Sequence, residues 1–344
     1  SGEVILAGKL SVLEEQTDPS GGMNIPKANL ELRSGDPIQT MFSELTGLDF
    51  QDGIILEADL DPKNESFLHD HEVNGVPILP GVMGIEGFTV AARHIVSELG
   101  TEGPGFNVSL LRQIRFETPL KFYRDEPRHI IWKAQVHQQN DEMVADVTLS
   151  SILKTKLGER KTSGQFSGQV VLEPTPILQP DNWRTVPEWG HDSILSKDEI
   201  YQIYFHGPSF QVLEGVQRWD EYVLGKLQPD FTPDSNHLMQ LTSHPILIEL
   251  CFQTAGVFEI GTTGQMRLPS SVGALKIYPN QVIGRDFYAL VKPRTILDDE
   301  MVFDAWVVDQ EGKIYLEMRD YRTVQLPNEL DASLVAPFKK ALGV

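Results

Sequence analysis

The sequence has only one cysteine, Cys251, in 344 residues, so no disulfide can form within the chain. A single thiol suits a reducing compartment, and we expect a cytoplasmic protein in which this thiol is buried and inert. Basic residues are also scarce, with 29 Lys and Arg against 49 Asp and Glu, which gives a formal net charge of −20. We therefore expect no binding to nucleic acid or to a membrane surface. No apolar run approaches the ~20 residues that a membrane span needs.

Apolar residues make up 40% of the chain, enough for a sizeable core. We divide the chain into a lead-in, a first unit, a proline-rich linker, a second unit and a tail, at residues 1–45, 46–173, 174–192, 193–328 and 329–344. Each unit contains a long helix-like segment followed by strand-like runs, the first helix running from about Val82 to Leu99. This order predicts an α+β fold in which each unit wraps a curved antiparallel sheet around a central helix.

The most informative motif is the run HEVNGVPILPG, which places His71 three residues before Gly75 and Gly75 four residues before Pro80. Histidine has an unperturbed pKa near ~6.5, so it can act as a base at neutral pH. A glycine permits a turn or a close approach of the backbone, and a proline fits the first turn of a helix. Gly81 and Val82 would open that helix.

Two further motifs lie downstream. In HPILIELCFQTAG, Glu249 and Gln253 are four residues apart, so on a helix both side chains reach one pocket. The second is the run YFHGPSFQ at 204–211. A weak internal repeat also pairs GVMGIEGFTVAA with HPILIELCFQTA and places Glu86 opposite Glu249.

Together the three motifs resemble those of the dehydratase domains of type I polyketide synthases. That family has His-x3-Gly-x4-Pro, a Tyr-Gly-Pro-x-Phe segment, and an Asp followed four residues later by Gln or His after a His-Pro pair. This chain departs from the pattern at Glu249, where most members have Asp, and at His206, where Tyr is usual. Discrete 3-hydroxyacyl-carrier-protein dehydratases of fatty acid synthesis also use Glu. The two departures look more like iterative synthases of polyenes or long chains, of polyunsaturated fatty acid-like or enediyne-like type.

The resemblance implies a double hotdog, with a catalytic base, His71, from the first unit and a catalytic acid, Glu249, from the second. It implies no cofactor. The implied partners are an acyl carrier protein bearing a phosphopantetheine-linked 3-hydroxyacyl chain and the other domains of a multidomain synthase, with a homodimer as a further expectation. The residues expected to bind or support the substrate are Gly75, Pro80, Gly81, Val82, Gln253, Tyr204, His206, Gly207, Pro208 and Phe210.

Dehydration of a 3-hydroxyacyl thioester needs a base at the α-carbon and an acid at the β-oxygen, and these residue types fit both tasks. The acid must hold a proton at pH 7, and we expect apolar neighbours to raise its pKa. Backbone N–H groups at Gly81 and Val82 would stabilise the charge on the thioester carbonyl. The apolar neighbours of Glu249 are Leu247, Ile248, Leu250, Phe252 and Val257.

Several alternatives stay open. Glu86 would form a second active site only if His237, close to Asp234 in the expected position, served it; otherwise we expect Glu86 to act as a cap or hydrogen-bonding group. His69 and His71 form a His-x-His pair, but no third ligand has suitable spacing, and we expect no metal. The densest basic residues, which could receive a carrier protein or simply face solvent, are Arg112, Arg115, Lys121, Arg124 and Arg128.

Other functions on the same fold are a cyclase or a double-bond isomerase, of product-template or pyran-forming type, because these enzymes also use a His and an acid. A domain of another class would be a catalytically silent structural or carrier-docking module. Complete motifs at His71 and Glu249 argue against a silent module. We expect a dehydratase that converts a 3-hydroxyacyl thioester into a 2-enoyl thioester during polyketide or fatty acid chain building.

Overall fold

The strand-like runs of the sequence pair into one antiparallel sheet of 13 strands, ordered β1-β2-β6-β7-β8-β5-β12-β15-β14-β13-β11-β10-β9. The first half supplies β1 Glu44–Asp49, β2 Gly53–Leu60, β5 Asn107–Phe116, β6 Arg128–Gln139, β7 Glu142–Thr155 and β8 Gly158–Glu173. The second half supplies β9 Leu195–Ser196, β10 Leu213–Trp219, β11 Tyr222–Leu227, β12 Gln265–Ile277, β13 Phe287–Ile296, β14 Glu300–Asp309 and β15 Ile314–Glu329.

The helices are α3 Ser66–His69, α4 Gly81–Glu98, α5 Lys197–Ile200, α7 Pro245–Thr263 and α8 Ala332–Leu342, with short 3-10 turns η1 Tyr123–Asp125 and η2 Pro208–Phe210. A separate hairpin joins β3 Glu72–Val73 to β4 Val76–Pro77. This computed structural model describes residues 41–49, 53–98, 107–140, 142–155, 158–173, 177–183, 189–190, 194–230, 237–278, 286–296 and 300–343. Most of the expected lead-in and part of the linker lie outside these residues.

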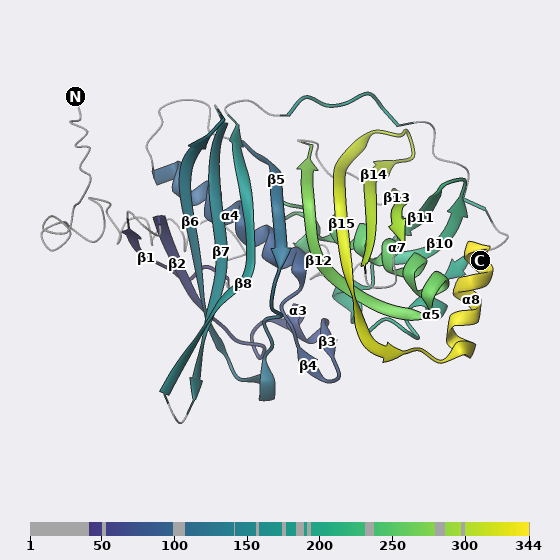
Figure 1. Cartoon of the computed structure of the whole chain (residues 1–344), viewed down its shortest axis with the longest axis horizontal. Helices are drawn as coiled ribbons and strands as arrows, with labels where there is room; N and C mark the ends of the chain where they lie inside the picture. The colour runs from purple at the N-terminus through teal and green to yellow at the C-terminus, as the bar shows by residue number, and fades with distance from the viewer. Residues whose placement is uncertain are drawn as a thin grey trace, which may run out of the picture.

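Each half wraps its strands around one long helix, as the order of elements predicts (Figure 1). Helix α4 contacts β5 to β8, and α7 contacts β10 to β14. The halves join where β5 pairs with β12, with Ile114 opposite Val272, and α4 also touches α7. The two halves of the sheet are continuous and their helices are adjacent, so a site can be enclosed between the halves.

Helix α7 is the core helix of the second half, and nearly all of its side chains are buried. Among the described residues it is the one helix that is long and apolar enough to cross a membrane by those two criteria. That differs from our reading of the sequence, which found no such run. Because the strands β10 to β14 pack against this helix, 83% of its apolar segment is buried inside the protein.

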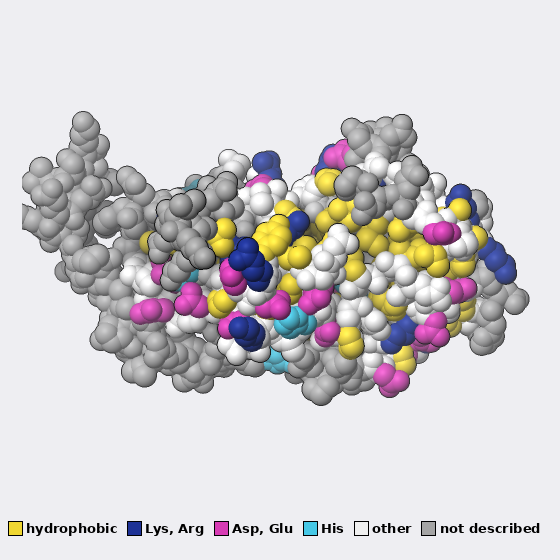
Figure 2. Space-filling model, turned by 90° about the horizontal axis from the view of Figure 1, so that it is seen from below, with side chains coloured by type: hydrophobic (Ala, Val, Ile, Leu, Met, Phe, Trp, Pro, Cys, Tyr) yellow, Lys and Arg dark blue, Asp and Glu magenta, His cyan; other side chains and the backbone are white. Residues whose placement is uncertain are grey.

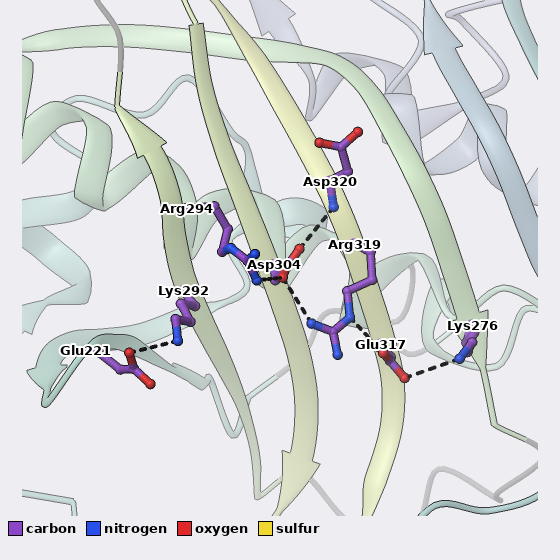
Figure 3. Close-up of polar contacts among 8 residues, drawn as sticks. All are labelled: Glu221, Lys276, Lys292, Arg294, Asp304, Glu317, Arg319 and Asp320. Atoms are coloured by element: carbon purple, nitrogen blue, oxygen red, sulfur yellow. Dashed lines mark hydrogen bonds and ion pairs between the residues drawn. The ribbon is translucent and has the colours of Figure 1, made fainter.

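The outer face of the second half carries a network of ion pairs (Figure 3). Strand residues alternate between faces, and Phe303 packs against α7, so the next residue, Asp304, points away from the helix. Asp304 Oδ2 accepts hydrogen bonds from Arg294 at 2.8 Å and Arg319 at 3.0 Å. Arg319 also contacts Glu317, at 2.7 Å. Charges therefore cover this part of the sheet.

The segment that we expected to be a tail forms α8. Its first turn is capped by Asp331, whose side chain accepts a hydrogen bond from Ser333 N at 2.8 Å. The helix lies against α7, and its buried residues are Val335, Phe338, Ala341 and Leu342. The end of the chain is thus part of the core that surrounds α7.

The packing of α8 can be tested with Phe338→Ala, which removes a side chain with 0% exposure. We expect the free energy of unfolding to fall by about 3–5 kcal/mol, as for other buried Phe→Ala changes. The control is Leu334→Ala on the same helix, where the side chain is 36% exposed and the effect should be small. Urea unfolding of both variants measures this, and equal stabilities would contradict the packing.

Candidate active site

The spacing of the His71 motif is that of a tight hairpin. Asn74 and Gly75 form the two-residue turn, with φ of 54° and 70°, which suits a type I′ turn. The turn brings Ile78 back opposite His71, so that Ile78 N donates to His71 O at 3.0 Å. Gly75 is exposed at the tip of the hairpin, so it is needed for the turn and does not contact substrate space.

The hairpin also fixes the protonation of the His71 ring. Its Nδ1 lies 2.9 Å from the carbonyl oxygen of Ile78, and only a protonated Nδ1 can donate to a carbonyl. The Nε2 atom therefore keeps its lone pair. Burial and the neighbouring His206 lower the pKa of His71 to about 4, although Glu249 opposes the shift. A neutral imidazole with a free Nε2 is a competent base.

The 204–210 segment of the second half lies directly against the His71 motif of the first half. His71 and His206 form an antiparallel bridge, and Gly207 N donates to Asp70 O at 2.8 Å. Asp70 also accepts hydrogen bonds from the backbone and hydroxyl of Ser209. A side chain at Gly207 would collide with Asp70, since a Cβ there would lie 2.8 Å from its Cα. These contacts explain why this turn needs glycine.

Glu249 projects from α7 into the same place, and two side chains hold its carboxyl group. Its Oε1 lies 3.2 Å from His206 Nε2 and accepts a hydrogen bond from Gln253 Nε2 at 2.8 Å. Gln253 is fixed in turn, because its Nε2 donates to Phe210 O at 2.7 Å and its Oε1 accepts from Tyr201 Oη at 2.7 Å. The carboxyl group therefore has one defined position.

The charge state of Glu249 differs from our expectation. Burial raises its pKa, as the apolar neighbours suggested, but the hydrogen bond and charge of His206 and the Gln253 hydrogen bond act against burial, and the net pKa lies below its ordinary value. The sequence did not reveal these partners, so we expected a protonated acid where the structure favours a carboxylate. The ring of His206 is itself buried, and among the described groups its Nδ1 has no hydrogen-bond partner.

One cavity contains both principal residues. Its empty volume, mouth included, is about 950 Å³, and His71 and Glu249 both line it. Of the other expected residues, Gly81, Tyr204, His206 and Gln253 also line it. The sequence did not single out Phe205, which lines the cavity, or Tyr201 and Asp70, which brace it. Expected residues that lie outside the cavity wall are Gly75, Pro80, Val82, Gly207, Pro208 and Phe210.

The start of α4 differs in detail from the prediction. The helix begins at Gly81, and Pro80 precedes it, with its carbonyl accepting hydrogen bonds from Met83 N and Gly84 N at 3.0 and 3.2 Å. Pro80 therefore occupies the N-cap position instead of the first turn. The N–H groups that follow it are orphan donors of a helix N-terminus, and Gly81 lies at the cavity wall.

Glu86 takes the structural role that we considered for it. It is fully buried, and its carboxyl group accepts hydrogen bonds from Thr242 N at 3.2 Å, Ser243 N at 2.7 Å and Ser243 Oγ at 2.5 Å. Burial raises its pKa, and the Ser243 and Thr242 bonds oppose that shift. No hydrogen bond joins it to His237 in the described part of the chain, and Asp234 lies outside that part. Glu86 thus ties α4 to the turn before α7.

The remaining candidates have ordinary partners. His69 pairs with Glu72 at 2.7 Å and does not share a ligand position with His71. Cys251 is completely buried, and burial raises the pKa of its thiol.

Two of the five basic residues are engaged in contacts within the protein. Arg112 forms an ion pair with Glu142, at 2.6 Å. Arg128 is buried, and its Nε donates a hydrogen bond to Lys121 O at 3.0 Å. On the face seen in Figure 2, the basic side chains are scattered among acidic ones.

Comparison with known proteins decides the family. Residues 42–151 match the family described as "Polyketide synthase dehydratase domain", and residues 195–333 match that described as "Polyketide synthase dehydratase N-terminal domain". The two matches follow one another along the chain and together cover well over half of it. The chain belongs to the polyketide synthase dehydratase family. The resemblance drawn from the three motifs is therefore confirmed.

Individual relatives agree with the family. Polyketide synthase PksN of Bacillus subtilis (strain 168) is 22% identical over 267 residues, which are 74% of this chain and 5% of the relative. A trans-AT synthase dehydratase domain from Brevibacillus brevis has a TM-score of 0.66 at 21% identity, covering 85% of this chain and 99% of that one. The dehydratase domain of the CurF module of curacin polyketide synthase has a TM-score of 0.65 at 18% identity, covering 84% and 99%. These matches confirm the double hotdog fold.

The protonation of His71 gives a pH prediction. With a pKa of about 4, the ring stays neutral in the folded protein where the unfolded chain, near ~6.5, takes up a proton. Its contribution to stability is thus complete above about pH 6.5 and is lost as the pH falls toward 4. By NMR, the His71 ring, assigned with a His71→Phe variant, should not titrate between about pH 8 and pH 5. A midpoint near ~6.5 would contradict a neutral ring whose Nδ1 donates to the Ile78 carbonyl.

Proposed function

We propose that His71 and Glu249 remove water from a 3-hydroxyacyl thioester to give a 2-enoyl thioester. His71 Nε2 takes the proton from the α-carbon, the β-carbon–oxygen bond breaks, and the leaving hydroxyl takes a proton from the Glu249 side. The observation that carries this proposal is that a neutral base from one half and a braced carboxyl group from the other line one largely apolar cavity.

The proton for the leaving group belongs to the pair formed by Glu249 and His206. Glu249 Oε1 lies 3.2 Å from His206 Nε2, so the proton that the reaction needs belongs to a coupled pair and not to an isolated acid. A proton on Glu249 can then reach the hydroxyl group. His206 acts as a positioning residue that also influences the charge of the acid.

The start of α4 would stabilise the second charge of the reaction. Negative charge develops on the thioester oxygen as the α-proton leaves, and free N–H groups at a helix N-terminus are suitable donors. Gly81 lies at the cavity wall near the His71 hairpin, so its N–H is our candidate, with Val82 N–H behind it.

We further infer that the substrate arrives on the phosphopantetheine arm of an acyl carrier protein, within a multidomain synthase, and that the domain acts as a homodimer. The chain spans about 5% of the length of the curated relative PksN, which fits one domain of a much longer protein. An iterative polyene or long-chain synthase remains our suggestion for its context, because of Glu249 and His206. A cyclase or isomerase product would retain the oxygen, so the mass of the product distinguishes these reactions.

The role of the acid is tested with Glu249→Gln, which keeps the shape and hydrogen bonds but cannot donate a carboxylic proton. We expect turnover to fall by about 10²–10⁴-fold while the substrate still binds. The matched control is Glu86→Gln, another buried glutamate in the sister helix, which should retain dehydration. Mass spectrometry of a carrier-bound 3-hydroxyacyl substrate measures product formation by both variants. A dead Glu86 variant beside an active Glu249 variant would reverse the assignment.

The role of His206 is tested with a pair of substitutions. His206→Phe removes the Nε2 donor to Glu249, and we expect kcat to fall roughly 10- to 100-fold through misplacement of the carboxyl group. His206→Tyr restores a donor and should recover most of that loss with little change in KM. Steady-state kinetics decide the matter. If the Phe variant matches the parent, or the Tyr variant is as slow as Phe, His206 does not position the acid.

A further inference from the structure

The cavity extends beyond the reacting residues to a second set of ionisable groups. Glu259 and Arg267 both line it, although they are only 1% and 6% exposed. Glu259 follows Glu249 by ten residues on α7, which places it about 15 Å further along the helix axis. Neither residue has a part in the dehydration proposed above, so their presence in this wall needs another reason.

The carboxyl group of Glu259 is only half satisfied. Its Oε1 accepts a hydrogen bond from the hydroxyl of Thr323, whereas Oε2 receives none within the described part of the chain. Oε2 lies beside Gly256, because a Cβ built on that glycine would be 3.9 Å from it and 2.5 Å from Tyr204 Oη. Gly256 and Tyr204 are themselves cavity residues, so this oxygen lies where the cavity passes along α7.

The surroundings keep this carboxyl group able to donate or accept. Burial raises the pKa of Glu259 to about 7, while the Thr323 bond and the charge of Arg267 oppose the shift. Near neutral pH both forms are therefore present. The cavity wall also contains apolar side chains, among them Phe252, Ile260 and Leu268. A buried polar atom without a partner is costly, and a hydrocarbon chain alone would leave Oε2 in that state.

The ionisable groups of the cavity differ in exposure. His71 is half-buried, and we place the entry of the carrier arm beside its hairpin. Glu259 and Arg267 are interior, although Met266, Leu268 and Pro269 beside Arg267 are half-buried. We propose that Glu259 and Arg267 form a subsite for an oxygen atom, a hydroxyl or keto group, on the distal part of the acyl chain. The domain would then favour a partly oxygenated chain over a hydrocarbon chain of equal length. This inference rests on the proposed function of His71 and Glu249.

The test uses pairs of pantetheine thioesters of equal length, one with a hydrocarbon chain and one with a hydroxyl group at a varied distal position. The thioesters that carry a 3-hydroxyl group are substrates, and they give kcat/KM. Matching thioesters without the 3-hydroxyl group cannot react, and calorimetry gives their dissociation constants. At the best position we expect the parent to prefer the oxygenated chain by at least about 10-fold, because a polar site discriminates strongly against an analogue that lacks its partner. Glu259→Leu should bring the ratio close to one, and Glu259→Gln should keep part of it.

The matched control is Glu86→Gln, whose buried carboxyl group lies outside the cavity and should leave the ratio as in the parent. A parent without preference at any position, or a Glu259→Leu variant that keeps it, would overturn the subsite. Equal weakening of both chains by Glu259→Leu would also overturn it, since that result assigns Glu259 to the carrier arm or to the cavity shape. If neither chain is dehydrated but the affinities still differ, the proposed reaction fails while the subsite stands.

Discussion

A carboxylate buried in the core of an α+β fold must be held by hydrogen-bond donors, and this requirement explains the arrangement around Glu249. Helix α7 is apolar on almost every side, so it supplies only one donor of its own, Gln253. The other donor, His206, comes from a segment that is itself tied to the first half through Asp70 and the His71 bridge. Both donors belong to the second half, and the contacts of Asp70 and His71 with the 206–209 segment join that half to the first at the cavity.

The same requirement explains the asymmetry between the halves. Glu86 occupies the position in α4 that Glu249 occupies in α7, and it too is fully buried. Its donors are the backbone N–H groups of residues 242 and 243 and the Ser243 hydroxyl, and it does not line the cavity. In the first repeat, Glu86 joins α4 to the turn before α7. In the second repeat, Glu249 lies in the same cavity as the base His71. The internal repeat thus preserves the fold, while the two buried acids have different roles among the described residues.

Much of this could be predicted from the sequence where the signal is local. The spacing from His71 to Pro80 encodes a two-residue turn and a helix start, and the spacing from Glu249 to Gln253 encodes one helix face. Contacts between distant segments could not be predicted. His206 lies 43 positions before Glu249 in the sequence, and no periodicity indicates that its ring meets that carboxyl group. We therefore expected a protonated acid. The ion pair of Arg112 with Glu142, 30 positions along the chain, is another such distant contact.

We propose that one substrate is held between His71 of the first half and Glu249 of the second. A crystal structure of the Glu249→Gln variant with a bound 3-hydroxyacyl pantetheine thioester tests it most directly. We expect the β-hydroxyl within about 3 Å of the residue-249 side chain and the α-carbon facing His71 Nε2. A substrate bound beside Glu86, or one whose hydroxyl group points away from α7, would rule out this arrangement.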